Sequence, residues 1–264
     1  GFDMRPFTIQ ADFIRHGVVL YRAVTWTGYF GILTAQKPDR FSVSVNYRPS
    51  SGYNDTEAEV HLNLSNVLRI LLGVFFLRER IVGALVREVM ESDRMYYDDA
   101  VMTLSRGTYF STYVRHTHTH THTHIPGALL SPVYFIVAGT KKGEGIGITR
   151  KSGVSHLRHQ TMSSNKKGST IVQCNTDWWK TDPLIDMMES KYRKRKAKEL
   201  IETLCSTFEV EPLMKGNHHD DPTRHANESG TLDPYWHFVG TRPIRNDITV
   251  YACVMCPAAS IFSA

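Results

Sequence analysis

The chain has 264 residues, of which 41% are hydrophobic and 22% are charged, with a formal net charge of +5. This composition is typical of a globular protein and excludes collagen-like, coiled-coil and wholly disordered chains. Four cysteines are too few for a disulfide scaffold, and so mild a charge does not by itself select a partner. The most apolar stretch, 67–77, is interrupted by Arg69 and is far shorter than the ~20 residues of a membrane span.

Alternating apolar and polar residues predict strands in the first part of the chain, and a three-to-four-residue periodicity predicts helices after them. The expected strands are 7–13, 17–24 and 41–46, with a hairpin turn at 15–17. The expected helices are 65–77, which takes Ser65 as its N-cap, then 80–91 and 96–104.

Strands return in the second half of the chain at 133–138, 146–149, 170–174 and 248–254, and a basic helix covers 185–208. Strands, then helices, then strands again indicate an α+β sandwich in which helices cover stacked antiparallel sheets. We expect one domain over residues 1–264.

A strict His-Thr alternation at 116–124 does not fit this scheme. Closely spaced imidazoles can chelate zinc or copper. A translated dinucleotide repeat has the same sequence, however, and the flanking residues continue neither neighbouring element. The favoured interpretation is an unstructured insertion at 106–127. A second His- and Asp-rich stretch, 215–233, has no recognised ligand spacing and is predicted to be a solvated loop, so no metal or cofactor is expected.

The basic run 191–198 matches the pattern of a nuclear-localisation or nucleic-acid-binding patch. On a helix its charges spread around most of the circumference, and no aromatic residues are interleaved for base stacking. We therefore interpret the run as a solvated helix face and predict no nucleic-acid partner.

Several segments, in order along nearly the whole chain, are similar to sequence blocks of one enzyme family. Residues 27–48 are similar to the family's Gly-Tyr-x-Gly-x-x-Thr-Gly-x-x-Pro block and the strand after it. Residues 132–150 are similar to its Tyr-Phe/Tyr-Ile-x-Gly-Gly and Glu-Gly-x-x-Ile-Thr-Arg blocks. Residues 172–180 are similar to Val-Gln-Thr-Asn-Tyr-Asp-x-Trp-Lys, and residues 248–251 fit the C-terminal strand. Together these segments resemble the acid ceramidase and N-acylethanolamine-hydrolysing acid amidase family.

The resemblance implies an N-terminal nucleophile hydrolase, an α+β fold with two stacked antiparallel sheets in an αββα sandwich. It implies hydrolysis of the ceramide amide to sphingosine and a fatty acid through a cysteine thioester. Autocleavage in this family frees the cysteine, and the cysteine's own α-amine serves as base. A thiol that is mostly protonated at acid pH needs such a base. The tetrahedral oxyanion needs fixed donors, each worth roughly 2.7–4 kcal/mol.

The resemblance also assigns three site residues. Asp3 takes the position of the aspartate that orients the amine of the nucleophile, and Asn175 that of the asparagine that donates to the oxyanion. Arg193 takes the position of an arginine in the family's Asp-x-Arg-Arg segment, from which the neighbouring residues depart. The nucleophilic cysteine and a further arginine fall before Gly1, so we expect this sequence to be inactive as it stands.

Each site residue also has a plain structural interpretation. Without the resemblance, Asp3 is a turn aspartate, and Asn175 and Asp177 are residues that cap a turn. Tyr47 stands where the family has a glutamate before the arginine at position 48. That substitution and the altered region around Arg193 motivate an alternative, a non-catalytic lipid-binding relative.

The resemblance also implies a set of partners. They are ceramide or another N-acyl lipid, an α-subunit cleaved from the same precursor, and a lipid-presenting activator protein. A lysosomal membrane surface completes the set. The implied location is the lysosome, with secretion as the alternative.

Overall fold

The computed structural model describes residues 3–48, 80–106, 129–150, 157–162, 170–179, 190–207, 237–242 and 253–264. Within these ranges, a seven-stranded antiparallel sheet forms the centre of the fold. The helix expected at 65–77 and the stretch 215–233 lie outside the described residues. So does the insertion expected at 106–127, apart from its first residue.

The strands follow the chain from one edge of the sheet to the other, each pairing with the next in antiparallel fashion. They are β1 (Thr8–Arg15), β2 (Val18–Trp26), β3 (Thr34–Lys37), β4 (Phe41–Tyr47), β5 (Val133–Gly139), β6 (Gly145–Arg150) and β7 (Leu157–Thr161). Five of the seven were expected from the sequence. The sequence missed β3, whose four residues are all buried and show no alternation, and β7, whose sequence is mostly polar.

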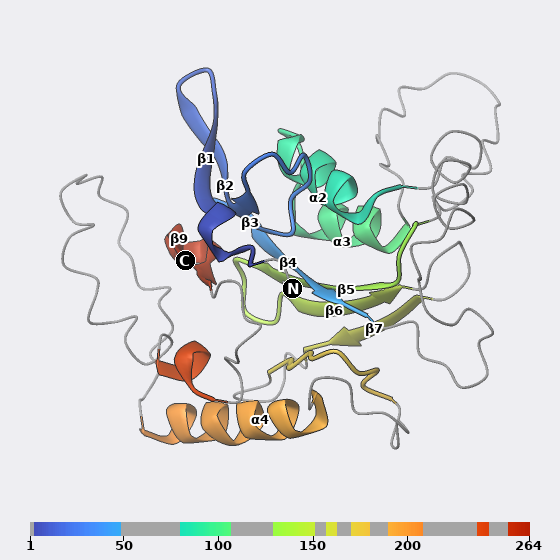
Figure 1. Cartoon of the computed structure of the whole chain (residues 1–264), viewed down its shortest axis with the longest axis vertical. Coiled ribbons are helices and arrows are strands. Elements are labelled where there is room, and N and C mark those ends of the chain that lie inside the picture. Colours follow the sequence, from blue (N-terminus) through green and yellow to red (C-terminus); the bar gives the residue numbers. More distant parts are fainter. Residues whose placement is uncertain are drawn as a thin grey trace.

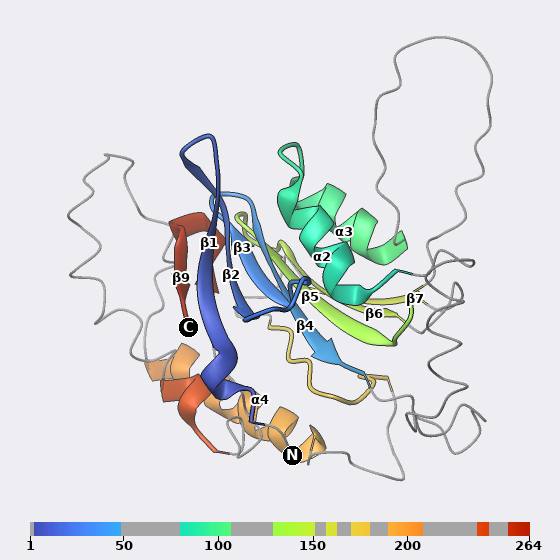
Figure 2. The same ribbon diagram turned by 45° about the horizontal axis from the view of Figure 1, so that its top comes forward.

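The first hairpin turns where the sequence predicted. Arg15 pairs with Val18, so the loop consists of His16 and Gly17, whose φ angles are +52° and +78°. Two successive positive φ values are typical of the type I′ turn, whose twist matches that of paired strands. The hairpin extends beyond the rest of the sheet (Figures 1 and 2).

Two helices, α2 (Val82–Glu91) and α3 (Tyr97–Arg106), cover one face of the sheet (Figure 1). The main hydrophobic core lies between them and the strands. Its fully buried members come from alternate positions on the strands and from the inner faces of the helices. They include Tyr21, Ala35, Phe41, Val43, Phe135, Val137, Ile148, Leu85, Val89, Met90 and Leu104.

The opposite face of the sheet is covered as well, because all six residues of β6 are buried. Ile171 lies 3.5 Å from where a Cβ of Gly147 would stand. The segment 170–179 passes between the sheet and α4 (Ser190–Thr207), on the side away from α2 and α3 (Figures 1 and 2). The layers of antiparallel sheet and helix agree with the predicted α+β class.

The C-terminal residues form a small second sheet of β8 (Val254–Cys256) and β9 (Ile261–Ser263), joined by a short 3-10 helix. It lies beside β1 and β2 (Figure 2), where Arg22 donates a 3.0 Å hydrogen bond to the carbonyl of Ser260. Of the strand expected at 248–254, only residues 253 and 254 are described, and Val254 begins β8.

The strand expected at 170–174 was wrong. In the structure these residues are extended but pair with no strand of the described chain. Residue 170 is exposed and residues 171–174 are all half-buried, so the segment lacks the alternation in burial of a strand with one covered face. Its links to β4 are made by side chains and not by a backbone ladder.

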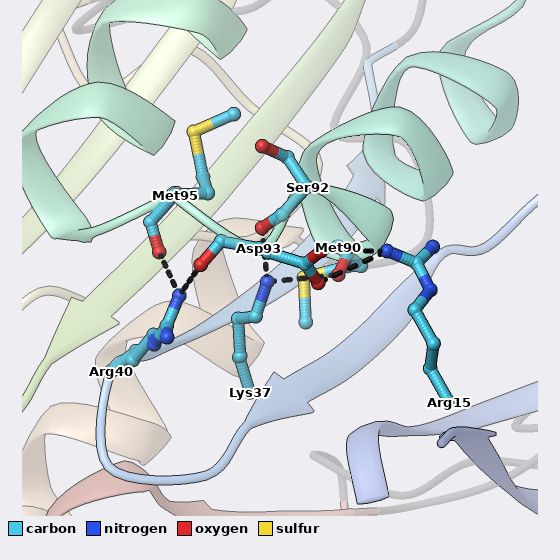
Figure 3. A network of polar contacts seen from close by, with 7 residues as sticks. All are labelled: Arg15, Lys37, Arg40, Met90, Ser92, Asp93 and Met95. Atoms are coloured by element: carbon cyan, nitrogen blue, oxygen red, sulfur yellow. Dashed lines mark hydrogen bonds and ion pairs between the residues drawn. The ribbon is translucent and has the colours of Figure 1, made fainter. Parts of the chain in front are cut away.

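A buried lysine closes the C-terminal end of α2. Lys37 on β3, which is 2% exposed, donates to the carbonyl of Met90 at 3.1 Å and to that of Ser92 (Figure 3). The last carbonyls of a helix have no partner within the helix, and a cation there also complements the helix dipole. Lys37 therefore satisfies groups that the sheet would otherwise bury unpaired.

Two arginines hold the connection that follows α2. Arg15 contacts both carboxylate oxygens of Asp93 at 3.0 Å, and Arg40 donates to the carbonyls of Asp93 and Met95 (Figure 3). Since these cations come from β1 and from the turn after β3, the connection between the two helices is fixed to the sheet.

The burial of Lys37 predicts a pH dependence of stability. Burial lowers the pKa of Lys37 to about 8, whereas an unfolded lysine keeps its proton up to about pH 10.4. Between these values the unfolded state binds more protons, so this residue's contribution to the free energy of unfolding rises with pH. The free energy of unfolding of wild type minus that of Lys37→Met should therefore be larger at pH 10.5 than at pH 8, by roughly 3 kcal/mol. Urea unfolding of both proteins at the two pH values measures this change. A difference that does not change with pH would contradict the burial of the charged amine.

Tight packing at the start of α2 gives a second prediction. A Cβ on Gly83 would meet the hydroxyl of Tyr29 and would stand 3.0 Å from the backbone Cα of Gly31. Gly83→Ala should therefore lower the free energy of unfolding by about 1–3 kcal/mol. The matched control is Gly147→Ala, whose Cβ would make only ordinary contacts and should change little. Equal effects of the two substitutions would show that the packing at Gly83 is looser than described.

Candidate active site

The end of β4 holds the segment 173–177 through alternate residues. The side chain of Asn46 donates to the carbonyl of Gln173 at 2.8 Å. The side chain of Asn175 donates to the carbonyl of Tyr47, also at 2.8 Å. Residues 46, 47 and 48 thus contact 173, 175 and 177 in turn. The segment lies along the end of β4 as a paired strand would, but side chains and not backbone hydrogen bonds hold it there.

The third contact is a buried ion pair between Arg48 and Asp177. The guanidinium Nε and Nη2 each lie 2.7 Å from a different oxygen of the carboxylate, and the two residues are 4% and 6% exposed. The hydroxyl of Tyr134, on β5, donates to Oδ1 of the same carboxylate at 2.7 Å. Bidentate pairing fixes the direction of the carboxylate as well as its distance.

The electrostatics of this triad are consistent with its geometry. Burial alone would lower the pKa of Arg48, but the hydrogen bonds and the attraction of Asp177 outweigh it and raise that pKa. Burial raises the pKa of Tyr134, and its hydrogen bond to Asp177 raises it further. The guanidinium therefore stays charged and the phenol stays a neutral donor over the physiological pH range.

The side chain of Asn175 has only one orientation that satisfies its neighbours. Arg193 donates to Oδ1 at 2.6 Å, and an arginine has no acceptor to offer in return. The carbonyl of Tyr47 is an acceptor, so it must face Nδ2. These two contacts together fix which way the amide of Asn175 points.

The backbone of Asn175 is held separately, by the first turn of α4. Its N–H donates at 2.8 Å to Oγ of Ser190, which is fully buried and also lies 3.2 Å from Oγ1 of Thr176. The backbone donor is therefore occupied. Among the described residues, the second hydrogen of Nδ2 meets no acceptor, which makes it the available donor of this residue.

Asp3 forms its hydrogen bonds with a residue outside this group. Its carboxylate accepts hydrogen bonds from the backbone N–H of Arg5 at 3.0 Å and from its Nε at 2.9 Å. These hydrogen bonds lower the pKa of Asp3, whose side chain is half exposed. Of the three expected site residues, Asn175 and Arg193 are therefore in direct contact. The hydrogen bonds of Asp3 are made with Arg5.

Three features of the site differ from what the sequence indicated. Asp177 does not cap a turn, because its carboxylate is taken by Arg48 and Tyr134. Tyr47 contributes its backbone carbonyl, so replacing a glutamate there leaves this contact intact. Ser190 was missed, since a serine 15 residues from Asn175 gives no local signal.

The basic run is not wholly a solvated face of α4. Lys191, Arg195 and Lys198 are exposed, but Arg193 and Lys194 are half-buried on the side of Ser190 and Ala197. Burial lowers the pKa of Lys194. The inward side of the helix therefore supplies the residues that contact Asn175.

Within the part of the chain that the structure describes, no three His, Cys, Asp or Glu residues gather as metal ligands would. Cys174, Cys253 and Cys256 form no disulfide within that part of the chain. No helix in the described ranges has the length and apolar character needed to cross a membrane.

No family model matches the chain, but curated proteins and a solved structure do. The chain is 28% identical to N-acylethanolamine-hydrolyzing acid amidase of Caenorhabditis elegans, over 96% of this chain and 54% of that protein. It is 30% identical to acid ceramidase of Mus musculus over 73% of this chain and 40% of that protein, and 24% identical to the Homo sapiens enzyme over 96% and 49%. The chain spans about half the length of the curated relatives it matches.

The structural comparison agrees. The solved structure of the Caenorhabditis elegans N-acylethanolamine-hydrolyzing acid amidase ortholog superposes with a TM-score of 0.61 and 26% identity, covering 97% of this chain and 82% of that one. The fold is therefore that of the N-terminal nucleophile hydrolases. Within that class, the chain is a homologue of the acid ceramidase and N-acylethanolamine-hydrolysing acid amidase family.

The buried ion pair predicts a strong dependence of stability on one charge. Asp177→Asn leaves the guanidinium of Arg48 buried without a carboxylate, which should lower the free energy of unfolding by roughly 3–5 kcal/mol. The matched control is Asp3→Asn, the same chemical change in an exposed pair, where we expect little change in the free energy of unfolding. Urea titration of both variants measures the difference, and similar small effects would contradict the burial of the pair.

Proposed function

We propose that residues 1–264 form a single amidase domain, the catalytic-subunit portion of an acid ceramidase-like enzyme. Its reaction is hydrolysis of the amide of ceramide, or of another N-acyl lipid, to the free amine and a fatty acid. The observation that carries this proposal is the amide of Asn175, oriented by Arg193 and the carbonyl of Tyr47 so that one Nδ2 hydrogen remains to be donated. The names of the relatives support the class of substrate.

The reaction begins with a cysteine thiol, which the resemblance places before Gly1. Its sulfur attacks the amide carbon while the cysteine's α-amine, oriented by Asp3, takes the thiol proton. Negative charge develops on the carbonyl oxygen, and the Nδ2 hydrogen of Asn175 stabilises it. Such a donor is worth most when it is already fixed before the reaction, because no reorganisation is then required.

The proton held by the α-amine then passes to the leaving nitrogen, and the carbon–nitrogen bond breaks to give the amine and a thioester. Water adds to the thioester through a second oxyanion at the same donor, which releases the fatty acid and restores the thiol. Arg193 acts by holding Oδ1 of Asn175 throughout, at 2.6 Å.

The proposal extends to the surroundings of such an enzyme. Its substrate is a membrane lipid, so the enzyme works at a lysosomal membrane surface, with an activator protein presenting the lipid. An α-subunit cut from the same precursor completes it. The resemblance to the acid ceramidases supports this location and these partners.

A non-catalytic lipid-binding relative is the second candidate. The glutamate that the family carries beside the arginine at position 48 is a tyrosine here, and that tyrosine is 56% exposed. A protein of this kind would bind ceramide but would not turn it over, even when joined to a cysteine-bearing segment.

The experiment compares two forms of the chain in release of a labelled fatty acid from ceramide in mixed micelles. Residues 1–264 alone should release none, and the chain joined to the cysteine-bearing segment upstream of it in its gene should be active. In the active form, Asn175→Ala should lower kcat by about 10²–10³-fold, whereas the exposed amide control Gln10→Ala should not. Turnover by residues 1–264 alone, or none by the joined form, would refute the proposal.

A further inference from the structure

We propose that Tyr134 is a positioning residue for this reaction, acting through Asp177 on the amide of Asn175. The inference rests on the proposed function and adds to it a residue that touches neither substrate nor nucleophile. It follows from how the segment 173–177 is attached to the sheet.

The segment is attached to β4 by side chains. Among the described residues no backbone ladder joins this segment to β4, so side-chain contacts of residues 46 to 48 link it to that strand. The first turn of α4 holds the backbone N–H of Asn175 from the other side. An extended segment held in this way can shift by a fraction of a residue if one contact yields. Asp177 is the far anchor, two residues beyond Asn175.

The bidentate pair fixes the carboxylate of Asp177 relative to the guanidinium of Arg48, but not relative to the sheet. A bidentate pair allows the carboxylate to move together with the long arginine side chain. Tyr134 adds a donor from a different strand, and its ring is held in a central position of the sheet, where it is 1% exposed. The carboxylate is then held from β4 and from β5 at once.

The register of the sheet puts this second anchor beside the first contact of the segment. Tyr134 is the partner of Asn46 across β4 and β5. Asn46 holds Gln173, and Tyr134 holds Asp177, so the two ends of the segment are tied to one pair of facing residues. Asn175 lies midway between them.

The consequence for the reaction concerns distance. If Asp177 moves, the contacts of Asn175 with Tyr47 and Arg193 lengthen, and the donated hydrogen leaves the place where charge develops. Displacement of a catalytic group by about 1 Å can cost about 10²-fold in rate. The loss should fall on kcat, because Tyr134 does not contact the substrate.

The chain offers a matched control in Tyr21, another fully buried tyrosine. Its hydroxyl has no hydrogen-bond partner among the described residues, and its ring belongs to the core under α2. Tyr134→Phe and Tyr21→Phe therefore remove the same atom, once with a partner and once without.

Turnover of ceramide by the cysteine-bearing form is the first measurement. We expect Tyr134→Phe to lower kcat between about tenfold and 10²-fold with KM changed less than twofold, and Tyr21→Phe to leave both constants unchanged. An unchanged kcat in Tyr134→Phe, or an equal loss in Tyr21→Phe, would overturn the proposal.

The second measurement needs no turnover, so it separates the two proposals. Hydrogen–deuterium exchange of the peptide 170–179 reports the N–H of Asn175, which is bonded to Ser190. Tyr134→Phe should speed exchange there at least about tenfold, with no change in Tyr21→Phe. If no lipid amide is turned over but exchange responds in this way, the proposed function fails and the positioning by Tyr134 stands. If exchange does not respond, the positioning fails whatever the activity.

Discussion

The rest of the site depends on one buried ion pair, that of Arg48 with Asp177. Taking two charges out of water is costly, and the cost is offset only where geometry is good and the remaining lone pairs are satisfied. Here the pairing is bidentate at 2.7 Å, and the hydroxyl of Tyr134 satisfies a further lone pair. The pair fixes the segment that carries Asn175, and this placement lets α4 bring Arg193 to it.

Buried cations serve both faces of the sheet. On the helix-covered face, Lys37 satisfies the end of α2, and Arg150 donates at 3.1 Å to the carbonyl of Leu104 near the end of α3. Burial lowers the pKa of Arg150 to about 10, which leaves it charged at the pH of any cell compartment. On the other face, Arg48 holds the site. Buried cations thus attach both the covering helices and the candidate active site to the same sheet.

The sequence predicted the parts of this structure that have a local pattern. The hairpin at His16 and Gly17, the long strands and α2 follow from alternation, periodicity and turn chemistry. Asn175 and Arg193 were found only through the family resemblance, and in the structure Arg193 donates a hydrogen bond to Asn175. Ser190 and Tyr134 were not found, because contacts across 15 and 43 residues leave no periodic signal. The segment 170–174 was misjudged because its sequence does not reveal that β4 holds it through a side chain, that of Asn46, and not through a backbone ladder.

The most direct test of the account is an experimental structure of the cysteine-bearing protein with a fatty acid or a reaction-intermediate analogue bound. The account predicts the ligand's carboxyl or oxyanion oxygen about 2.7–3.1 Å from Nδ2 of Asn175, with Arg193 on Oδ1. It also predicts that Asp177 lies between Arg48 and Tyr134. A ligand bound away from Asn175, or an amide turned so that Oδ1 faces the ligand, would contradict it.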